Sequence, residues 1–232
     1  MPVKKWIISA NYAIEGILHA ARTQRHVRYH LYSASTVLLA SYILGVARTD
    51  FLILSIAVVI VLLAEMFNTA IEYVVDMISP EFSEKARIAK DVSAGAVLIT
   101  AFGAAVLGYI ILFPYCNDAF NRGIVVAKHP KQEITLIAVI LVLILVVMLK
   151  AYFGKGHPLR GGMPSGHAAL AFSVWAAITY STMNFTASFL CLVLATLVAR
   201  SRVTEKEHSP MEVIVGAVLG AGITLLLFFI FY

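Results

Sequence analysis

Two loops in the C-terminal half of the chain carry the residue types that phosphoryl transfer requires. One contains the run Pro164-Ser-Gly-His167, and the other contains Arg202, followed by His208 and Glu212. Two histidines can supply one nucleophile and one general acid. Glu212 lies four residues after His208, on the same face of an expected helix, and can fix the tautomer of that histidine. The spacing therefore predicts a pair of catalytic histidines, one of them oriented by a carboxylate.

Basic and small residues near these histidines could bind a phosphate group. Lys155, Arg160 and Arg202 carry positive charge, and a guanidinium can hold a phosphate through two parallel hydrogen bonds. Ser165 and the N–H of Gly166 lie where a helix is expected to begin, so they add donors at the positive end of the helix dipole. These residues predict a phosphoryl-transfer site that needs no metal.

The same segments resemble the type 2 phosphatidic-acid phosphatase superfamily, and the resemblance covers residues 134–232. It implies hydrolysis of a membrane lipid phosphate without a cofactor. By this resemblance His208 forms a phosphohistidine and His167 protonates the leaving group. The phosphoryl oxygens would be bound by Lys155, Arg160, Ser165, Gly166 and Arg202. The superfamily usually has Asp where this chain has Glu212, and it separates its first lysine and arginine by six residues rather than four.

A second set of polar residues lies inside an apolar stretch of the N-terminal half. Glu65, Asn68, Glu72 and Asp76 follow one another at helical spacing and fall within a stripe about 80° wide. A carboxylate inside a membrane helix costs on the order of 2.5–3.5 kcal/mol at the bilayer centre. Carboxylate oxygens suit Mg²⁺, and a further carboxylate can act as a general base. The stripe therefore predicts a metal–nucleotide site.

This stripe, together with Ala89-Lys90-Asp91 and Ser93-Ala-Gly-Ala-Val97, resembles the prokaryotic diacylglycerol kinase family, which includes undecaprenol kinases. The resemblance runs without gaps from about Asn11 to Phe113. It implies a homotrimer whose active sites form between subunits at the cytoplasmic face and use Mg²⁺ and ATP.

The resemblance also assigns residue roles in the kinase-like part. Glu65 would be the general base on the lipid hydroxyl, and Glu72 would be a Mg²⁺ ligand. The nucleotide and its phosphates would be bound by Tyr12, Asn68, Lys90 and Asp91. Gln24 occupies the position of a second metal-ligating glutamate and brings no negative charge, so metal affinity should be lower.

The composition shows which environment must hold these residues. Only 13% of the 232 residues are charged, 60% are hydrophobic, and the mean hydropathy is +0.87. Soluble domains carry about 25% charged residues, so the chain is predicted to reside in a membrane. Two distant cysteines exclude a disulfide framework or a cysteine-based metal cluster. The net charge of +5 is ordinary for a membrane protein and gives no indication of nucleic-acid binding.

Helical periodicity predicts an all-α integral membrane protein. Residues 4–28 form an amphipathic pattern typical of a helix on the membrane surface. About seven spans follow, three in the kinase-like part and four in the phosphatase-like part: 30–46, 51–78, 92–113, 134–153, 164–182, 186–200 and 210–232. The expected domains are 1–113 and 134–232, with 114–133 as an extracytoplasmic linker.

Basic residues predict the orientation in the membrane. Lys and Arg concentrate in the loops that lie on the same side of the membrane as the N-terminus. The positive-inside rule assigns that side to the cytoplasm. The N-terminus and both sites would then face the cytoplasm of a bacterial inner membrane, and the C-terminus would lie outside.

Two lipid phosphate sites in one chain favour undecaprenyl phosphate supply: hydrolysis of undecaprenyl diphosphate, with phosphorylation of undecaprenol if the kinase-like part is active. An alternative is a phosphatase for phosphatidic acid or phosphatidylglycerophosphate, with the kinase-like part as a silent trimeric scaffold. A transporter is a third hypothesis, but the polar residues cluster at one membrane face rather than at mid-depth.

Overall fold

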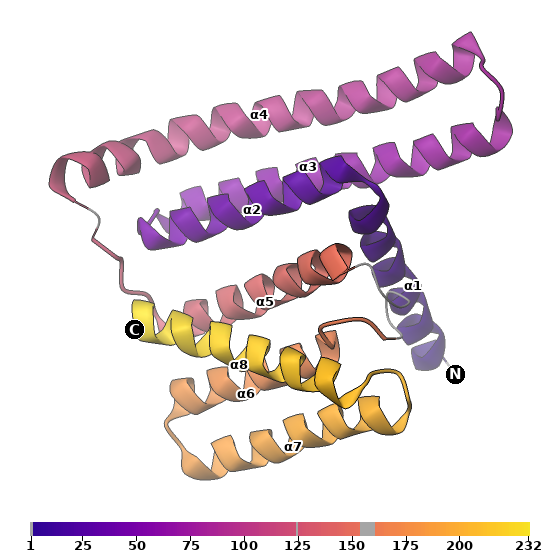
Figure 1. Cartoon of the computed structure of the whole chain (residues 1–232). Coiled ribbons are helices and arrows are strands. Elements are labelled where there is room, and N and C mark those ends of the chain that lie inside the picture. The colour runs from indigo at the N-terminus through magenta and orange to yellow at the C-terminus, as the bar shows by residue number, and fades with distance from the viewer. Residues whose placement is uncertain (1, 124, 154–160) are drawn as a thin grey trace. The chain divides into compact units, whose positions relative to one another are not determined.

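The computed structural model describes residues 2–123, 125–153 and 161–232, with side chains from residue 8 onward. Within those ranges the chain forms eight helices and no strands (Figure 1). The helices are α1 (Pro2–Thr23), α2 (Arg25–Ile43), α3 (Arg48–Ile78), α4 (Glu84–Arg122), α5 (Lys131–Phe153), α6 (Gly166–Thr182), α7 (Phe185–Thr204) and α8 (Pro210–Phe231).

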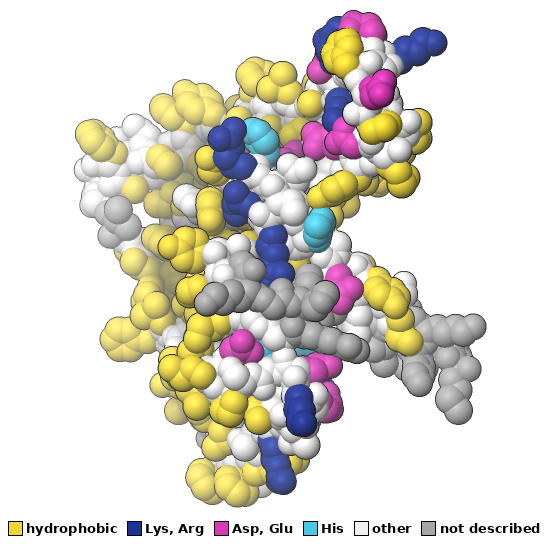
Figure 2. All heavy atoms as spheres, turned by 45° about the vertical axis from the view of Figure 1, so that its right-hand side comes forward, with side chains coloured by type: hydrophobic (Ala, Val, Ile, Leu, Met, Phe, Trp, Pro, Cys, Tyr) yellow, Lys and Arg dark blue, Asp and Glu magenta, His cyan; other side chains and the backbone are white. Residues whose placement is uncertain are grey.

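Five helices of the described part, α3, α4, α5, α7 and α8, are long and apolar enough to cross a membrane. Their outward faces are apolar: on α3, Leu52, Ile56 and Leu63 are each more than half exposed. Figure 2 shows the hydrophobic side chains that cover much of the surface in view. The all-helical class is thus confirmed, but two of the seven expected spans, α2 and α6, are not both long and apolar enough to cross a membrane. Polar residues dilute α2, and α6 has only 17 residues.

The helices group into two compact units. The terminal unit contains Met1–Arg22 and Lys128–Tyr232, and the central unit contains Thr23–Ala127. The helix expected on the membrane surface is therefore grouped with the C-terminal helices. The amphipathic pattern of residues 4–28 is interrupted at Gln24, whose extended backbone separates α1 from α2.

In the central unit, α3 packs against both α2 and α4. Its buried residues are Leu54, Ala57, Val61, Glu65 and Thr69, which recur every three or four positions on one face. The apolar residues of this face anchor the helix in the interior. The same periodicity therefore carries Glu65 into a buried position.

The linker expected at 114–133 is helical in its first part, because α4 continues through Pro114 to Arg122. A proline inside a helix removes one backbone hydrogen bond. Contacts farther on hold the extension in place: the Tyr115 hydroxyl donates to Oδ2 of Asp50 (3.3 Å) and accepts from the N–H of Ala47 (3.1 Å). These two residues lie at the start of α3, and sequence periodicity alone does not reveal such a contact.

In the terminal unit, α6 packs against α5, α7 and α8. Two glycines bring the backbones of α6 and α8 together: a Cβ at Gly216 would lie 2.4 Å from the Ser165 carbonyl oxygen, and one at Gly220 would lie 1.9 Å from that of Ala169. Small residues permit such close approach between membrane helices. The start of α6 is thereby fixed against the start of α8, where the two expected histidine segments lie.

Candidate functional sites

The polar stripe of α3 forms a hydrogen-bonded network in the central unit. Nδ2 of Asn68 donates to Oε1 of Glu72 (3.0 Å), and Nε2 of Gln24 donates to Oε2 of the same carboxylate (3.3 Å). Oγ of Ser93 donates to Oδ1 of Asn68 (2.6 Å), which ties α4 to the stripe. The structure therefore brings together three predicted site residues. It also adds Ser93 to the site. The sequence indicated this residue only through its place in the Ser93–Val97 run of the family motif.

Glu65 lies one turn before this network and is only 4% exposed. A buried carboxylate that follows a face of apolar residues is suited to receive a proton from a substrate hydroxyl in a dry environment. Lys90 forms an ion pair with Asp76, so it also joins α4 to the stripe. Asp91 instead pairs with Arg87 on its own helix (2.7 Å), and its side chain is largely exposed.

Glu72 is the residue of the network best placed to hold Mg²⁺. In the described part of the chain, no group of three or more His, Cys, Asp and Glu side chains could hold a metal. Mg²⁺ in nucleotide sites is usually bound through one or two carboxylates together with substrate phosphates. The Glu72 carboxylate, with the Gln24 amide beside it, fits that mode of binding.

Tyr12, the remaining residue expected near the nucleotide, lies on α1 in the terminal unit, and its relation to Glu65 stays a prediction. Its side chain is 68% exposed. It borders a cavity of about 300 Å³ that is also lined by His167, Arg202 and Glu207. Tyr12, which was expected at the nucleotide site, thus lines a cavity together with His167 and Arg202, which were expected at the phosphoryl-transfer site of the C-terminal half.

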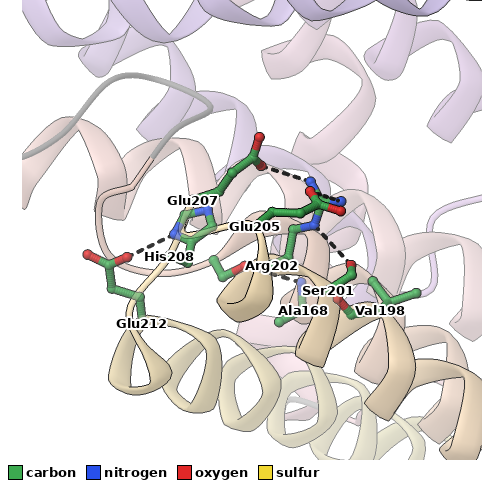
Figure 3. Close-up of polar contacts among 9 residues, drawn as sticks. Ala168, Val198, Ser201, Arg202, Glu205, Glu207, His208 and Glu212 are labelled. Atoms are coloured by element: carbon green, nitrogen blue, oxygen red, sulfur yellow. Dashed lines mark hydrogen bonds and ion pairs between the residues drawn. The ribbon is translucent and has the colours of Figure 1, made fainter.

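His208 and Glu212 form a direct pair at the start of α8 (Figure 3). Nδ1 of His208 lies 2.9 Å from Oε2 of Glu212, and His208 is only 5% exposed. When Nδ1 carries the proton, Glu212 accepts it in a hydrogen bond and Nε2 keeps its lone pair. The arrangement can therefore present Nε2 as a nucleophile.

Backbone groups hold the Glu212 carboxylate in place. Ser209 caps α8: its hydroxyl accepts from the N–H of Glu212 (3.3 Å), and its own N–H donates to Oε2 of Glu212 (3.1 Å). The N–H of Gly162 donates to Oε1 (3.2 Å), which brings the loop before α6 to the same carboxylate. Such a capping box satisfies two backbone donors of the first turn at once.

Arg202, at the end of α7, is held by two carboxylates that the sequence analysis did not single out. Its guanidinium lies 2.9 Å from Glu205 and 2.8 Å from Glu207 (Figure 3). Its carbonyl oxygen accepts from the N–H of His208 (3.1 Å), so the turn places Arg202 and His208 together. A phosphate bound at Arg202 must share or displace these carboxylates. The sequence feature that could have predicted these ion pairs is the presence of two glutamates between Arg202 and His208.

The start of α6 provides the second histidine. Ser165 is the N-cap, its hydroxyl accepts from the N–H of Ala168 (3.5 Å), and its own N–H donates to the carbonyl oxygen of Glu212 (2.9 Å). Gly166 follows as the first helical residue, and His167 lies exposed in the cavity beside Arg202. The helix start thus lies next to the start of α8. The predicted Lys155 and Arg160 fall outside the described residues.

Comparison with known proteins identifies the N-terminal half. The family described as prokaryotic diacylglycerol kinase matches residues 11–112. A diacylglycerol kinase of Synechocystis sp. is 36% identical over 109 residues, which cover 47% of this chain and 62% of that protein. An undecaprenol kinase of Bacillus subtilis is 32% identical over 103 residues, 44% of this chain and 84% of that protein.

A diacylglycerol kinase of Haemophilus influenzae is 27% identical over 107 residues, which cover 46% of this chain and 91% of that protein. No solved structure matches the chain. Residues 113–232 lie outside the family match, and each of these alignments covers less than half of the chain. Through its N-terminal half, with the polar stripe of α3 and the Ser93 segment of α4, the chain belongs to the prokaryotic diacylglycerol kinase family.

Proposed function

We propose that the chain is a multi-pass membrane enzyme that produces lipid monophosphates at two sites. The kinase-like site phosphorylates a lipid alcohol, and the site of the terminal unit removes one phosphate from a lipid diphosphate. Undecaprenyl phosphate is the common product when the substrates are undecaprenol and undecaprenyl diphosphate. The undecaprenol kinase relative supports this lipid, and the His208–Glu212 pair carries the proposal for the second site.

In the kinase reaction, Glu65 accepts the proton of the lipid hydroxyl while the hydroxyl oxygen attacks the terminal phosphorus of ATP. The bond from that phosphorus to the bridging oxygen breaks, and ADP leaves. Asn68 and Lys90 would bind and orient the nucleotide phosphates, and Glu72 with Gln24 would hold Mg²⁺. Mg²⁺, when bound with the nucleotide, neutralises the phosphate charge that opposes the attack. The burial of Glu65 and the network on Glu72 support these roles.

In the phosphatase reaction, Nε2 of His208 attacks the terminal phosphorus while Glu212 stabilises the proton on Nδ1. The bond to the bridging oxygen breaks, and His167 can donate a proton to the leaving group. Water then attacks the phosphohistidine, the P–N bond breaks, and inorganic phosphate leaves. Arg202, Ser165 and Gly166 would bind the phosphoryl oxygens, with Lys155 and Arg160 from the adjoining loop.

A lipid panel tests both activities. Purified protein is assayed for phosphate release from undecaprenyl diphosphate, phosphatidic acid and phosphatidylglycerophosphate, and for transfer from ATP to undecaprenol and diacylglycerol with Mg²⁺. We expect undecaprenyl diphosphate and undecaprenol to be the best substrates. Glu65→Gln should abolish transfer from ATP and leave phosphate release unchanged. No release from any of the three phosphorylated lipids would refute the phosphatase.

The second candidate is a glycerolipid phosphatase whose kinase-like part serves only as a trimeric scaffold. The observation that favours it is Gln24, which leaves Glu72 as the one carboxylate of the hydrogen-bonded network. Phosphate release from phosphatidic acid, without any transfer from ATP, would identify this function. Chemical cross-linking of the full chain in detergent, which should yield trimers, tests the homotrimer proposed from the family.

Both sites are proposed to face the cytoplasm of a bacterial inner membrane, with the C-terminus outside. Ser209, which begins α8 beside the phosphatase-like pair, reports on this orientation. In a chain with Cys116 and Cys191 replaced by serine, Ser209→Cys should react with an impermeant maleimide only after the cells are permeabilised. Labelling in intact cells would contradict the orientation.

A further inference from the structure

The guanidinium of Arg202, the proposed phosphate ligand of the terminal unit, is already bound by groups of its own chain (Figure 3). Nη1 donates to Oε2 of Glu207 (2.8 Å), Nη2 lies 2.9 Å from Oε2 of Glu205, and Nε donates to Oγ of Ser201 (3.3 Å). Each nitrogen of the guanidinium thus has a partner, and two of the partners are carboxylates. Both carboxylates compete with any phosphate for this side chain.

The two carboxylates differ in where they lie. Glu207 lines the cavity of about 300 Å³ together with Arg202 and His167, and its side chain is 26% exposed. Glu205 is not among the described residues that line this cavity, and its side chain is 50% exposed. His167 is the proposed proton donor to the leaving group, so the phosphate must lie in the cavity that this histidine lines. Glu207 therefore occupies the side of the guanidinium from which a phosphate approaches.

The turn after α7 fixes Glu207 in this place. The N–H of Glu207 donates to the carbonyl oxygen of Arg202 (3.2 Å), and the N–H of Lys206 donates to that of Val203 (3.0 Å). These two bonds form the Schellman motif, which ends many helices, and Lys206 has the positive φ (56°) that the motif requires. The end of the helix therefore holds the backbone of Glu207 against Arg202 and directs its carboxylate to the guanidinium.

An exchange of anions at Arg202 discriminates between kinds of phosphate. A phosphodiester, such as the head group of a membrane phospholipid, carries a single negative charge, so it would replace the Glu207 carboxylate without adding charge. A terminal phosphate carries a charge of about −1.5 to −2 at pH 7 and offers three acceptor oxygens. Its attraction to the guanidinium therefore exceeds that of the carboxylate that it displaces. A resident group that disfavours the wrong ligand is a general basis of specificity.

We propose that Glu207 is a specificity-determining residue of the phosphatase-like site, which admits terminal phosphates to Arg202 and excludes phosphodiesters. This inference rests on the proposed phosphatase function and adds the means by which the site rejects the phospholipids around its substrate. When a terminal phosphate binds, its oxygens replace Oε2 of Glu207 on Nη1 of Arg202. Glu205 remains on Nη2 and keeps the guanidinium in position.

The test measures inhibition by a phosphodiester in Glu207→Gln, which keeps the size of the side chain and removes its charge. Hydrolysis of the best substrate from the lipid panel is followed in detergent micelles that contain increasing amounts of phosphatidylglycerol. The inhibition constant of this lipid should be at least about fivefold lower in the variant than in the wild type, because the lost charge corresponds to one ion pair. Glu205→Gln removes the other carboxylate partner of the same guanidinium. It is the matched control, and its inhibition constant should remain close to that of the wild type.

Binding separates a failure of this inference from a failure of the proposed function. At constant ionic strength, inorganic phosphate should raise the melting temperature of the wild-type protein, whereas dimethyl phosphate, a soluble phosphodiester, should not. In Glu207→Gln both anions should raise it. If the wild type hydrolyses no lipid yet the two proteins differ in this way, only the phosphatase is refuted.

Three results would overturn the inference. In the first, Glu207→Gln lowers the melting temperature or the turnover but leaves the responses to both phosphodiesters unchanged, which is the result of a merely structural role. In the second, dimethyl phosphate stabilises the wild type as strongly as inorganic phosphate does. In the third, inorganic phosphate stabilises neither protein, which would show that Arg202 does not bind a phosphate.

Discussion

The two sites hold their key carboxylates in different ways. In the central unit, Glu72 accepts from the side-chain amides of Asn68 and Gln24, so single substitutions can remove its partners. In the terminal unit, Glu212 accepts from the backbone N–H groups of Ser209 and Gly162 as well as from His208. Backbone donors remain when side chains change. Single side-chain substitutions should therefore change the position of the Glu72 carboxylate readily. The position of the Glu212 carboxylate should change chiefly when the backbone at the starts of α6 and α8 is altered.

The largest expected effect separates the two activities. His208→Ala should lower lipid diphosphate hydrolysis by about 10³-fold or more, because no other described side chain is held in the same way to attack phosphorus. Transfer from ATP should be unchanged in the same preparation. Phosphate release and radiolabelled lipid formation measure the two rates. Hydrolysis at the wild-type rate would show that His208 is not the nucleophile.

Glu212→Gln should lower hydrolysis by about 10–100-fold, because a neutral amide orients His208 but stabilises its positive charge poorly. The loss should lie in kcat, with KM nearly unchanged, because Glu212 contacts His208 and is proposed to orient it rather than to bind the lipid. Ser209→Ala is the companion variant: it removes the side-chain cap but leaves the carboxylate, and its effect should be smaller. A loss confined to KM would contradict the orienting role.

In the central unit, Gln24→Glu should improve a property rather than impair one, because it should raise the affinity for Mg²⁺. A second carboxylate beside Glu72 should raise Mg²⁺ affinity about tenfold, measured as the Mg²⁺ concentration that half-saturates lipid phosphorylation. Gln24→Asn, which keeps the amide and shortens the side chain, is the control and should not raise the affinity. Unchanged Mg²⁺ dependence in the glutamate variant would place the metal away from residue 24.

The last prediction concerns how the terminal unit is held together. Gly220→Ala should destabilise the protein by about 1–3 kcal/mol, because the added methyl group would meet the Ala169 carbonyl oxygen. Gly222, two residues farther on, has open space around its Cβ position, so Gly222→Ala should be neutral or slightly stabilising. Thermal unfolding in detergent compares the two. Equal melting temperatures would contradict the close contact of α6 and α8.

Local spacing predicted much of this arrangement, because i and i+4 positions on a helix are neighbours whatever surrounds them. The stripe from Glu65 to Asp76 is of this kind. The pair of His208 and Glu212 was expected on one face of a helix, but His208 lies before the N-cap Ser209 of α8, so the contact forms across the start of the helix. Contacts between segments that are distant in the sequence could not be predicted from spacing. The Tyr115–Asp50 contact holds the part of α4 beyond Pro114, and the packing of α5 on α6 places Val146 against Gly166. Neither depends on a periodicity within one segment.

The capping box of α8 explains why this chain has glutamate at position 212. The carboxylate must reach back to the N–H of Ser209 and also meet Nδ1 of His208, and both contacts are made by the same oxygen. Aspartate is one methylene shorter and would fit the box poorly. The start of α8 and the orientation of His208 therefore depend on one side chain, so a substitution at position 212 must change both at once.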